Sequence, residues 1–120
     1  MKVRDDGDFD VSPGESIRIT VQRDAPPCVA VFRLAVGCAC GAVSQPDART
    51  AVKSCTSPST VGAEWDQTIV FGFPANPGGT GPANNHYHVT IEGAPEGDTG
   101  QDDVNAPPDP RDRTYTFHVS

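Results

Sequence analysis

Apolar and polar residues alternate along five short stretches of the chain, and this pattern predicts β-strands. In the first stretch Ile17, Ile19 and Val21 alternate with polar residues, which is the spacing of a strand with one buried face. The other four stretches are residues 28–36, 64–73, 85–92 and 113–119. Turn-forming residues separate them, and Ser12-Pro13-Gly14-Glu15 is expected to be a turn before the first strand. The chain should therefore run back and forth as strands joined by turns.

The alternation also predicts which side chains form the core. The inward positions are expected to be Ala30, Phe32, Leu34 and Val36 in the second stretch, Trp65, Ile69, Phe71 and Phe73 in the third, Tyr87, Val89 and Ile91 in the fourth, and Tyr115, Phe117 and Val119 in the last. Trp65, the only tryptophan, is expected to pack against Phe32, Phe71 and Tyr87 between two sheets.

The segments between these stretches have weaker periodicity. Residues 37–63 and 93–112 are expected to be loops, with one or two short edge strands near residues 50–53, and residues 5–10 form an acidic lead-in. Gly and Pro supply 12 residues each, which excludes a helical bundle because both residues break helices. The prediction is an all-β fold, an antiparallel β-sandwich of about seven strands, forming a single domain over residues 1–120.

Three short sequences resemble those of immunoglobulin-like domains. They are VSPGESIRITVQ near the start and NHYHVTIEG and RTYTFHVS near the end. In such domains a Pro-Gly turn precedes the second strand, and a tyrosine opens the sixth. The resemblance implies an immunoglobulin-like sandwich as an architecture, and an architecture does not by itself define a function.

The charge of the chain excludes some partners. Nine Lys and Arg residues against 16 Asp and Glu residues give a formal net charge of −7. Nucleic acids and anionic membrane surfaces attract basic proteins, so neither is an expected partner. No apolar run approaches the roughly 18 residues that a membrane-spanning helix needs.

The three histidines form the clearest candidate for a metal site. His86, His88 and His118 each lie beside inward-facing residues, so all three should point outward. If the last two predicted strands pair as an antiparallel hairpin with Ile91 opposite Arg113, then His86 lies opposite His118. Three imidazoles at such separations could bind Zn²⁺, Cu²⁺ or Ni²⁺. The alternative is that they are ordinary solvated side chains, and no cofactor is then required.

Two further patterns suggest other sites. Gly81, His86, His88, Glu92 and Gly97 resemble the first cupin motif, although both glycine spacings differ from it. Asp6, Asp8 and Asp10 alternate and could supply oxygen ligands for Ca²⁺, as could the acidic loop near residues 98–109. The sequence contains no calcium-binding loop of the EF-hand type, no nucleophile elbow and no phosphate-binding glycine loop, so no enzymatic activity is expected.

Four cysteines permit two disulfides. They are Cys28, Cys38, Cys40 and Cys55, and their spacing matches no common zinc pattern. Cys38 and Cys40 are separated by one residue, so we expect them to bond to Cys28 and Cys55 rather than to each other. Disulfides would fit an oxidising compartment, whereas free thiols are the alternative that a virion component would show.

These features favour a non-catalytic immunoglobulin-like module used for binding or assembly. Its setting would be a secreted or surface protein of a bacterium, or a phage virion in which it decorates the particle. Its partner would be a protein or carbohydrate surface, or further copies of the chain as a homo-oligomer. The alternatives are a small metal-binding β protein that uses the three histidines, and a divergent cupin.

Overall fold

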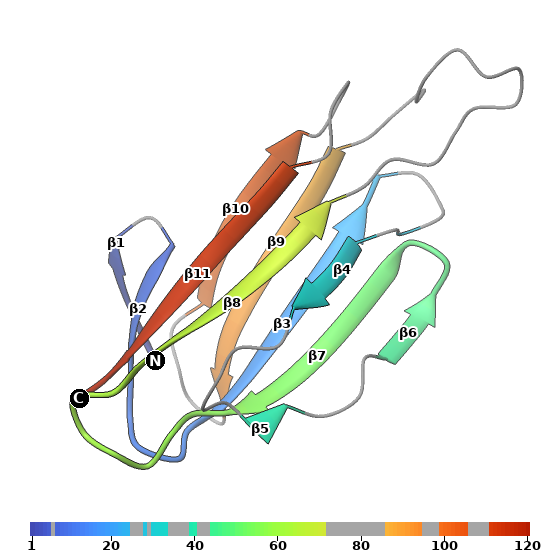
Figure 1. Ribbon diagram of the computed structural model, residues 1–120. Coiled ribbons are helices and arrows are strands. Elements are labelled where there is room, and N and C mark those ends of the chain that lie inside the picture. The colour runs from blue at the N-terminus through green and yellow to red at the C-terminus, as the bar shows by residue number, and fades with distance from the viewer. Residues whose placement is uncertain are drawn as a thin grey trace, which may run out of the picture.

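The chain is all-β in a computed structural model, which describes residues 1–5, 7–24, 28, 30–33, 39–40, 44–71, 86–94, 99–105 and 111–120. Side chains are described in these ranges except at residues 5, 30–33, 39–40, 94, 99–105 and 111–112. The described residues form eleven strands (Figure 1). They are β1 (Lys2–Asp5), β2 (Asp8–Val11), β3 (Ser16–Arg23), β4 (Ala30–Arg33), β5 (Ala39–Cys40), β6 (Ser44–Asp47), β7 (Thr50–Thr56), β8 (Glu64–Phe71), β9 (His86–Ala94), β10 (Thr99–Asn105) and β11 (Arg111–Val119).

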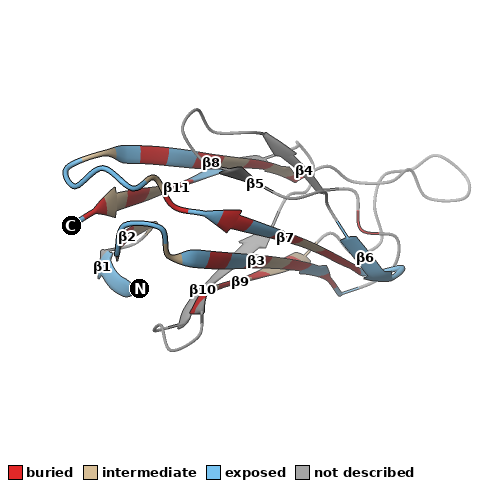
Figure 2. Cartoon of the chain, turned by 90° about the horizontal axis from the view of Figure 1, so that it is seen from below, coloured by how far each residue is buried: buried red, intermediate tan, exposed pale blue. Residues whose placement is uncertain are grey.

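The strands form two sheets. The first sheet has the order β1-β2-β11-β8-β4, and the second has the order β10-β9-β3-β7-β5, with β6 also paired to β7. Every pairing is antiparallel except that of β2 with β11, which is parallel. Figure 2 shows the two sheets as separate layers. The predicted β-sandwich is confirmed, although short strands raise the number above the seven expected. Within the described ranges no helix is long and apolar enough to cross a membrane.

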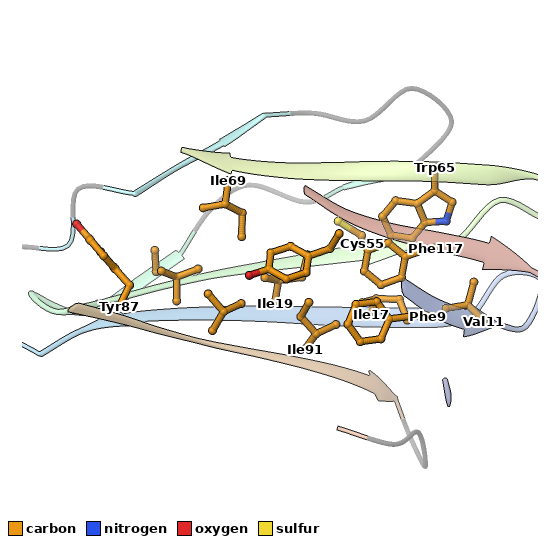
Figure 3. Close-up of a cluster of buried hydrophobic side chains, with 14 of the residues drawn as sticks. Phe9, Val11, Ile17, Ile19, Cys55, Trp65, Ile69, Tyr87, Ile91 and Phe117 are labelled. Atoms are coloured by element: carbon orange, nitrogen blue, oxygen red, sulfur yellow. The ribbon is translucent and has the colours of Figure 1, made fainter. Parts of the chain in front are cut away.

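The core lies between the sheets, and the alternation of the sequence explains it. In β3, buried Ile17, Ile19 and Val21 alternate with exposed or half-buried residues. The same alternation buries Trp65, Ile69 and Phe71 of β8, Tyr87, Val89 and Ile91 of β9, and Tyr115, Phe117 and Val119 of β11. Figure 3 shows side chains of this cluster meeting between the two layers. These inward faces are confirmed, whereas Leu34, Val36 and Phe73 and the side chains of Ala30 and Phe32 lie outside the description.

Aromatic rings fill two places in this core. Trp65 stacks on Phe117 with ring centroids 4.1 Å apart, and Phe117 stacks on Phe9 at 5.2 Å. Phe71 and Tyr87 form a separate tilted pair at 5.1 Å. Trp65 is therefore buried as predicted, but its stacking partner is Phe117, the residue opposite it on β11.

The predicted turn before β3 is confirmed. The Glu15 N–H donates to the Ser12 carbonyl oxygen at 3.1 Å, which closes a four-residue turn. Gly14 has a φ of 70°, and with proline before it this is the pattern of a type II turn. The turn positions Glu15 so that its own N–H donates to the Ser57 hydroxyl at 2.9 Å. The start of β3 is thereby fastened to the segment that follows β7.

Three segments that were expected to be loops or lead-in contain strands. Residues 5–10 contribute to β1 and β2, residues 99–105 form β10, and residues 50–56 form β7 as a full strand between β3 and β5 rather than as an edge strand. In β7 the alternation was masked because Lys53, which lies between inward-facing Ala51 and Cys55, is buried although it is polar. A polar residue that faces inward breaks the apolar-polar pattern from which a strand is predicted.

The predicted hairpin between the last two strong strands is wrong. β9 pairs with β3 and β10 in the second sheet, whereas β11 pairs with β2 and β8 in the first. β10 follows β9 and occupies its free edge, so the chain crosses to the other sheet before β11 begins. Neighbouring strands in the sequence pair only about two-thirds of the time, and alternation gives the face of each strand but not its partner.

Candidate functional site

Four carboxylates gather on the outer face of the first sheet. Asp8 and Asp10 lie on β2, and Glu64 and Asp66 lie on β8, at positions that alternate with buried residues. β11 runs between these two strands and contributes Thr116 and His118 to the same face. We call these six residues the acidic face.

His118 contacts carboxylates on both neighbouring strands. Its Nε2 lies 3.0 Å from Oδ1 of Asp8, and its Nδ1 lies 3.5 Å from Oε2 of Glu64. The side chain of His118 is 22% exposed, while that of Glu64 is 65% exposed. When the ring is protonated, it can therefore form ion pairs that join β2, β11 and β8 across the sheet.

Further contacts surround this histidine. The Thr116 hydroxyl donates to Oδ1 of Asp66 at 2.8 Å, and Arg4 lies 3.8 Å from Oδ1 of Asp10. One row along the sheet, the hydroxyls of Thr68 and Thr114 lie 2.9 Å apart. Each contact joins side chains from neighbouring strands, so the acidic face is a set of cross-strand pairs on an open surface.

The outer face of the second sheet carries its own polar pairs. Arg18 of β3 donates to Glu92 of β9 through its Nη2 at 2.9 Å and its Nε at 3.2 Å. Gln22 donates to the Thr50 hydroxyl at 3.2 Å, so these contacts link β3 to strands on both sides. We call Arg18, Gln22, Thr50, His88 and Glu92 the mixed face, in which His88 lies opposite Gln22.

His86 lies at the end of β9 and is held by the segment that follows β3. Its Nδ1 is 3.0 Å from Oδ2 of Asp24. The Asp24 N–H also donates to the His86 carbonyl oxygen at 3.0 Å. This double contact gives His86 a structural neighbour that sequence periodicity did not predict.

The three histidines do not share a surface. His86 and His88 belong to β9 in the second sheet, and His118 belongs to β11 in the first. Because the inner faces of the two sheets pack together, their outer faces look in opposite directions. The predicted neighbouring positions of His86 and His118 are therefore wrong, for the same reason that the predicted hairpin is wrong. Within the described ranges, no three His, Cys, Asp or Glu side chains form a group that could hold one metal ion.

The other two proposed ligand sets are only partly described. Asp8 and Asp10 share the acidic face, where they lie near His118 and Arg4, while Asp6 lies outside the described residues. Of the residues that resemble the cupin motif, His86, His88 and Glu92 lie on β9 between inward-facing residues. Gly81 and Gly97 lie outside the description.

The cysteines fall in three places. Cys28 is buried and donates its backbone N–H to the Ala48 carbonyl oxygen at 2.8 Å. The expected disulfide of Cys28 stays a prediction. Cys55 is buried on β7 at 2% exposure, and the β5–β7 register places Cys40 opposite it. Cys38 lies outside the described residues.

A tight turn between β6 and β7 carries a perturbed carboxyl group. Hydrogen bonds hold the pKa of Asp47 below its ordinary value of 3.8, first from the Arg49 backbone N–H and then from the Thr50 side chain, since both favour the charged form. The Arg49 N–H lies 2.8 Å from Oδ1 of Asp47. This carboxylate is exposed, and it stabilises the turn by accepting hydrogen bonds from the backbone that follows it.

The cross-strand partners of His118 were missed by sequence reasoning. Asp8 is 110 residues from His118 in the chain, so no local spacing connects them. The available signal was the alternation in residues 8–11, DFDV, which marks a short strand with Phe9 inward and Asp8 and Asp10 outward. Comparison of the chain with models of protein families, with curated proteins and with solved structures gives no match.

Proposed function

We propose that this chain is a non-catalytic binding or assembly module of the immunoglobulin-like sandwich type. The observation that carries the proposal is the arrangement of the acidic face, in which residues suited to catalysis are used for contacts between strands. His118, Asp8 and Glu64 lie on an open sheet surface, with Glu64 65% exposed. Acid–base catalysis is favoured by a concave, water-poor site, whereas an open and braced sheet face suits recognition of another surface.

The two-sheet architecture supports this proposal. Two packed sheets with antiparallel pairing agree with the immunoglobulin-like resemblance. The two closing sequences that carried the resemblance lie in different sheets, so the proposal rests on the sandwich rather than on a match of individual strands. Two outer faces with different charge patterns offer two surfaces to partners, one of them acidic.

The proposed setting is the outside of a bacterial cell or the surface of a phage particle, where the module would contact protein, carbohydrate or further copies of itself. Immunogold labelling of the source cells and of any particles they release tests the setting. Label on the envelope or on particles is expected. Label confined to the cell interior would contradict the proposed location.

Binding is tested with the purified chain on arrays of surface polysaccharides and envelope or capsid proteins from the same source. Retention of a partner that is recovered chemically unchanged is expected. Asp66→Asn on the acidic face and Arg18→Gln on the mixed face are matched surface variants that show which face makes the contact. Conversion of the retained compound with turnover would instead identify an enzyme.

A further inference from the structure

The end of the second sheet brings two cysteines into direct opposition. Cys40 of β5 and Cys55 of β7 are partners in an antiparallel ladder. Directly opposed residues in such a ladder have Cα atoms about 4.5–5.5 Å apart. Disulfides require Cα separations of about 4.4–6.8 Å. The register therefore meets the backbone requirement for a bond between these two residues.

The surroundings of Cys55 also support a disulfide at this position. Its side chain is 2% exposed and belongs to the buried cluster that includes Trp65 and Phe117. The Cys55 sulfur takes part in a disulfide, and the residue opposite Cys55 in the ladder is Cys40. We propose that Cys40 is the partner of Cys55, so that a single cross-strand disulfide fastens β5 to β7.

The bond would hold the short strand β5 at the edge of the second sheet. β5 has only two residues, and a strand this short makes too few backbone hydrogen bonds to hold its place at a sheet edge. A covalent bond keeps the segment on β7 and covers part of an edge that could otherwise pair with another chain. It also restricts the unfolded chain by closing the loop between residues 40 and 55.

Formation of this disulfide requires an oxidising compartment. Two thiols lose two protons and two electrons to form the bond, and an oxidised low-molecular-weight or protein disulfide accepts them by exchange and is itself reduced to thiols. Such exchange goes to completion in oxidising compartments outside the cytosol. This inference does not depend on what the module binds, so it can hold even if the proposed function fails.

Peptide mapping tests the pairing on the whole chain, exported to an oxidising compartment and purified without reductant. After denaturation, alkylation with N-ethylmaleimide and trypsin digestion, Cys28 lies in residues 24–33, Cys38 and Cys40 in residues 34–49, and Cys55 in residues 54–111. The expected result is a cross-link between the second and third peptides and an alkylated first peptide. Fragmentation of the linked pair should place the bond on Cys40.

Two matched variants separate the adjacent cysteines. Cys38→Ala should keep the cross-link, whereas Cys40→Ala should leave Cys55 alkylated and lower the melting temperature by roughly 5–15 °C relative to Cys38→Ala. Fragmentation of the wild-type peptide decides the question even if Cys40→Ala does not fold. A bond on Cys38, a link between residues 24–33 and 54–111, or alkylation of all four cysteines would overturn the proposal.

Discussion

The stacked rings of Trp65 and Phe117 show how single residues hold the first sheet. They are direct neighbours across β8 and β11, and their planes are inclined by only 13°. Trp65 is 2% exposed, so its large ring transfers from water into the core on folding. A buried aromatic side chain of this kind is among the largest single contributors to stability.

Trp65→Ala should lower the free energy of unfolding by about 3–5 kcal/mol, because it removes the ring and leaves a cavity between the sheets. The measurement is urea unfolding followed by circular dichroism. Trp65→Phe is the matched variant. The buried Nε1 of Trp65 has no hydrogen-bond acceptor among the described residues, so a phenyl ring should retain most of the stability. Equal losses for both variants would contradict this account of the site.

The contact between His118 and Asp8 should contribute to the stability of the first sheet. In a double-mutant cycle, Asp8→Asn and His118→Asn should show a coupling of about 0.5–1 kcal/mol in the free energy of unfolding, because His118 Nε2 lies 3.0 Å from Oδ1 of Asp8. The control cycle combines His118→Asn with Glu92→Gln, whose side chains lie on different sheets and should show no coupling. The prediction fails if the two cycles give the same coupling.

At the scale of elements, the faces of the strands follow from sequence but their partners do not. The alternation in β3, β8, β9 and β11 placed the buried residues correctly because an amphipathic strand has only two faces. It could not reveal that β10 pairs with the free edge of β9 or that β11 crosses to the other sheet. Those choices depend on the whole set of strands that compete for each edge, and this information is not local.

For the candidate sites too, the sequence predicted the face of a residue but not its neighbours. The sequence identified His118 as an outward-facing group and Asp8 and Asp10 as candidate ligands, and the structure places all three on the acidic face. It predicted the wrong companions for His118, because the partners were inferred from a hairpin that does not form. The contact of His118 with Asp8 arises from the parallel pairing of β2 and β11, which connects opposite ends of the chain.

The β6–β7 turn provides a prediction at the scale of one element. The lowered pKa of Asp47 means that its carboxylate contributes stability above the ordinary pKa of 3.8, and this contribution is lost as the pH falls through the folded value. Asp47→Asn should therefore lower the melting temperature at pH 7, and this loss should shrink as the pH falls below 3.8. Thermal unfolding across this pH range checks this.

The two contributions of Arg49 to the lowered pKa of Asp47 can also be separated by mutation. The backbone N–H of Arg49 is its largest source, and the charge of the Arg49 side chain is a smaller one. Arg49→Ala should therefore leave most of the lowered pKa of Asp47 in place, as measured by carboxyl chemical shifts in an NMR titration. A return to the ordinary value in this variant would show that the guanidinium, rather than the turn, is responsible.

At the scale of the molecule, the central position of β11 joins distant parts of the chain. β11 pairs with β2 on one side and with β8 on the other. Without it, the first sheet would consist of the pair β1–β2 and the pair β4–β8. Phe9 lies opposite Phe117 in the parallel ladder, so this contact closes nearly the whole chain into one loop.

The position of β11 has a consequence for synthesis on the ribosome. β2 and β8 leave the exit tunnel long before β11, which lies between them in the sheet. Their apolar faces, with Phe9 and Trp65, therefore stay exposed until β11 emerges. Stalled nascent chains that end before residue 111 should be digested rapidly by protease, whereas chains in which residues 111–119 have cleared the tunnel should resist. Protection of the shorter chains would show that the second sheet folds and shields them first. A holdase chaperone that binds exposed apolar strands should accordingly associate with this chain until its last strand emerges.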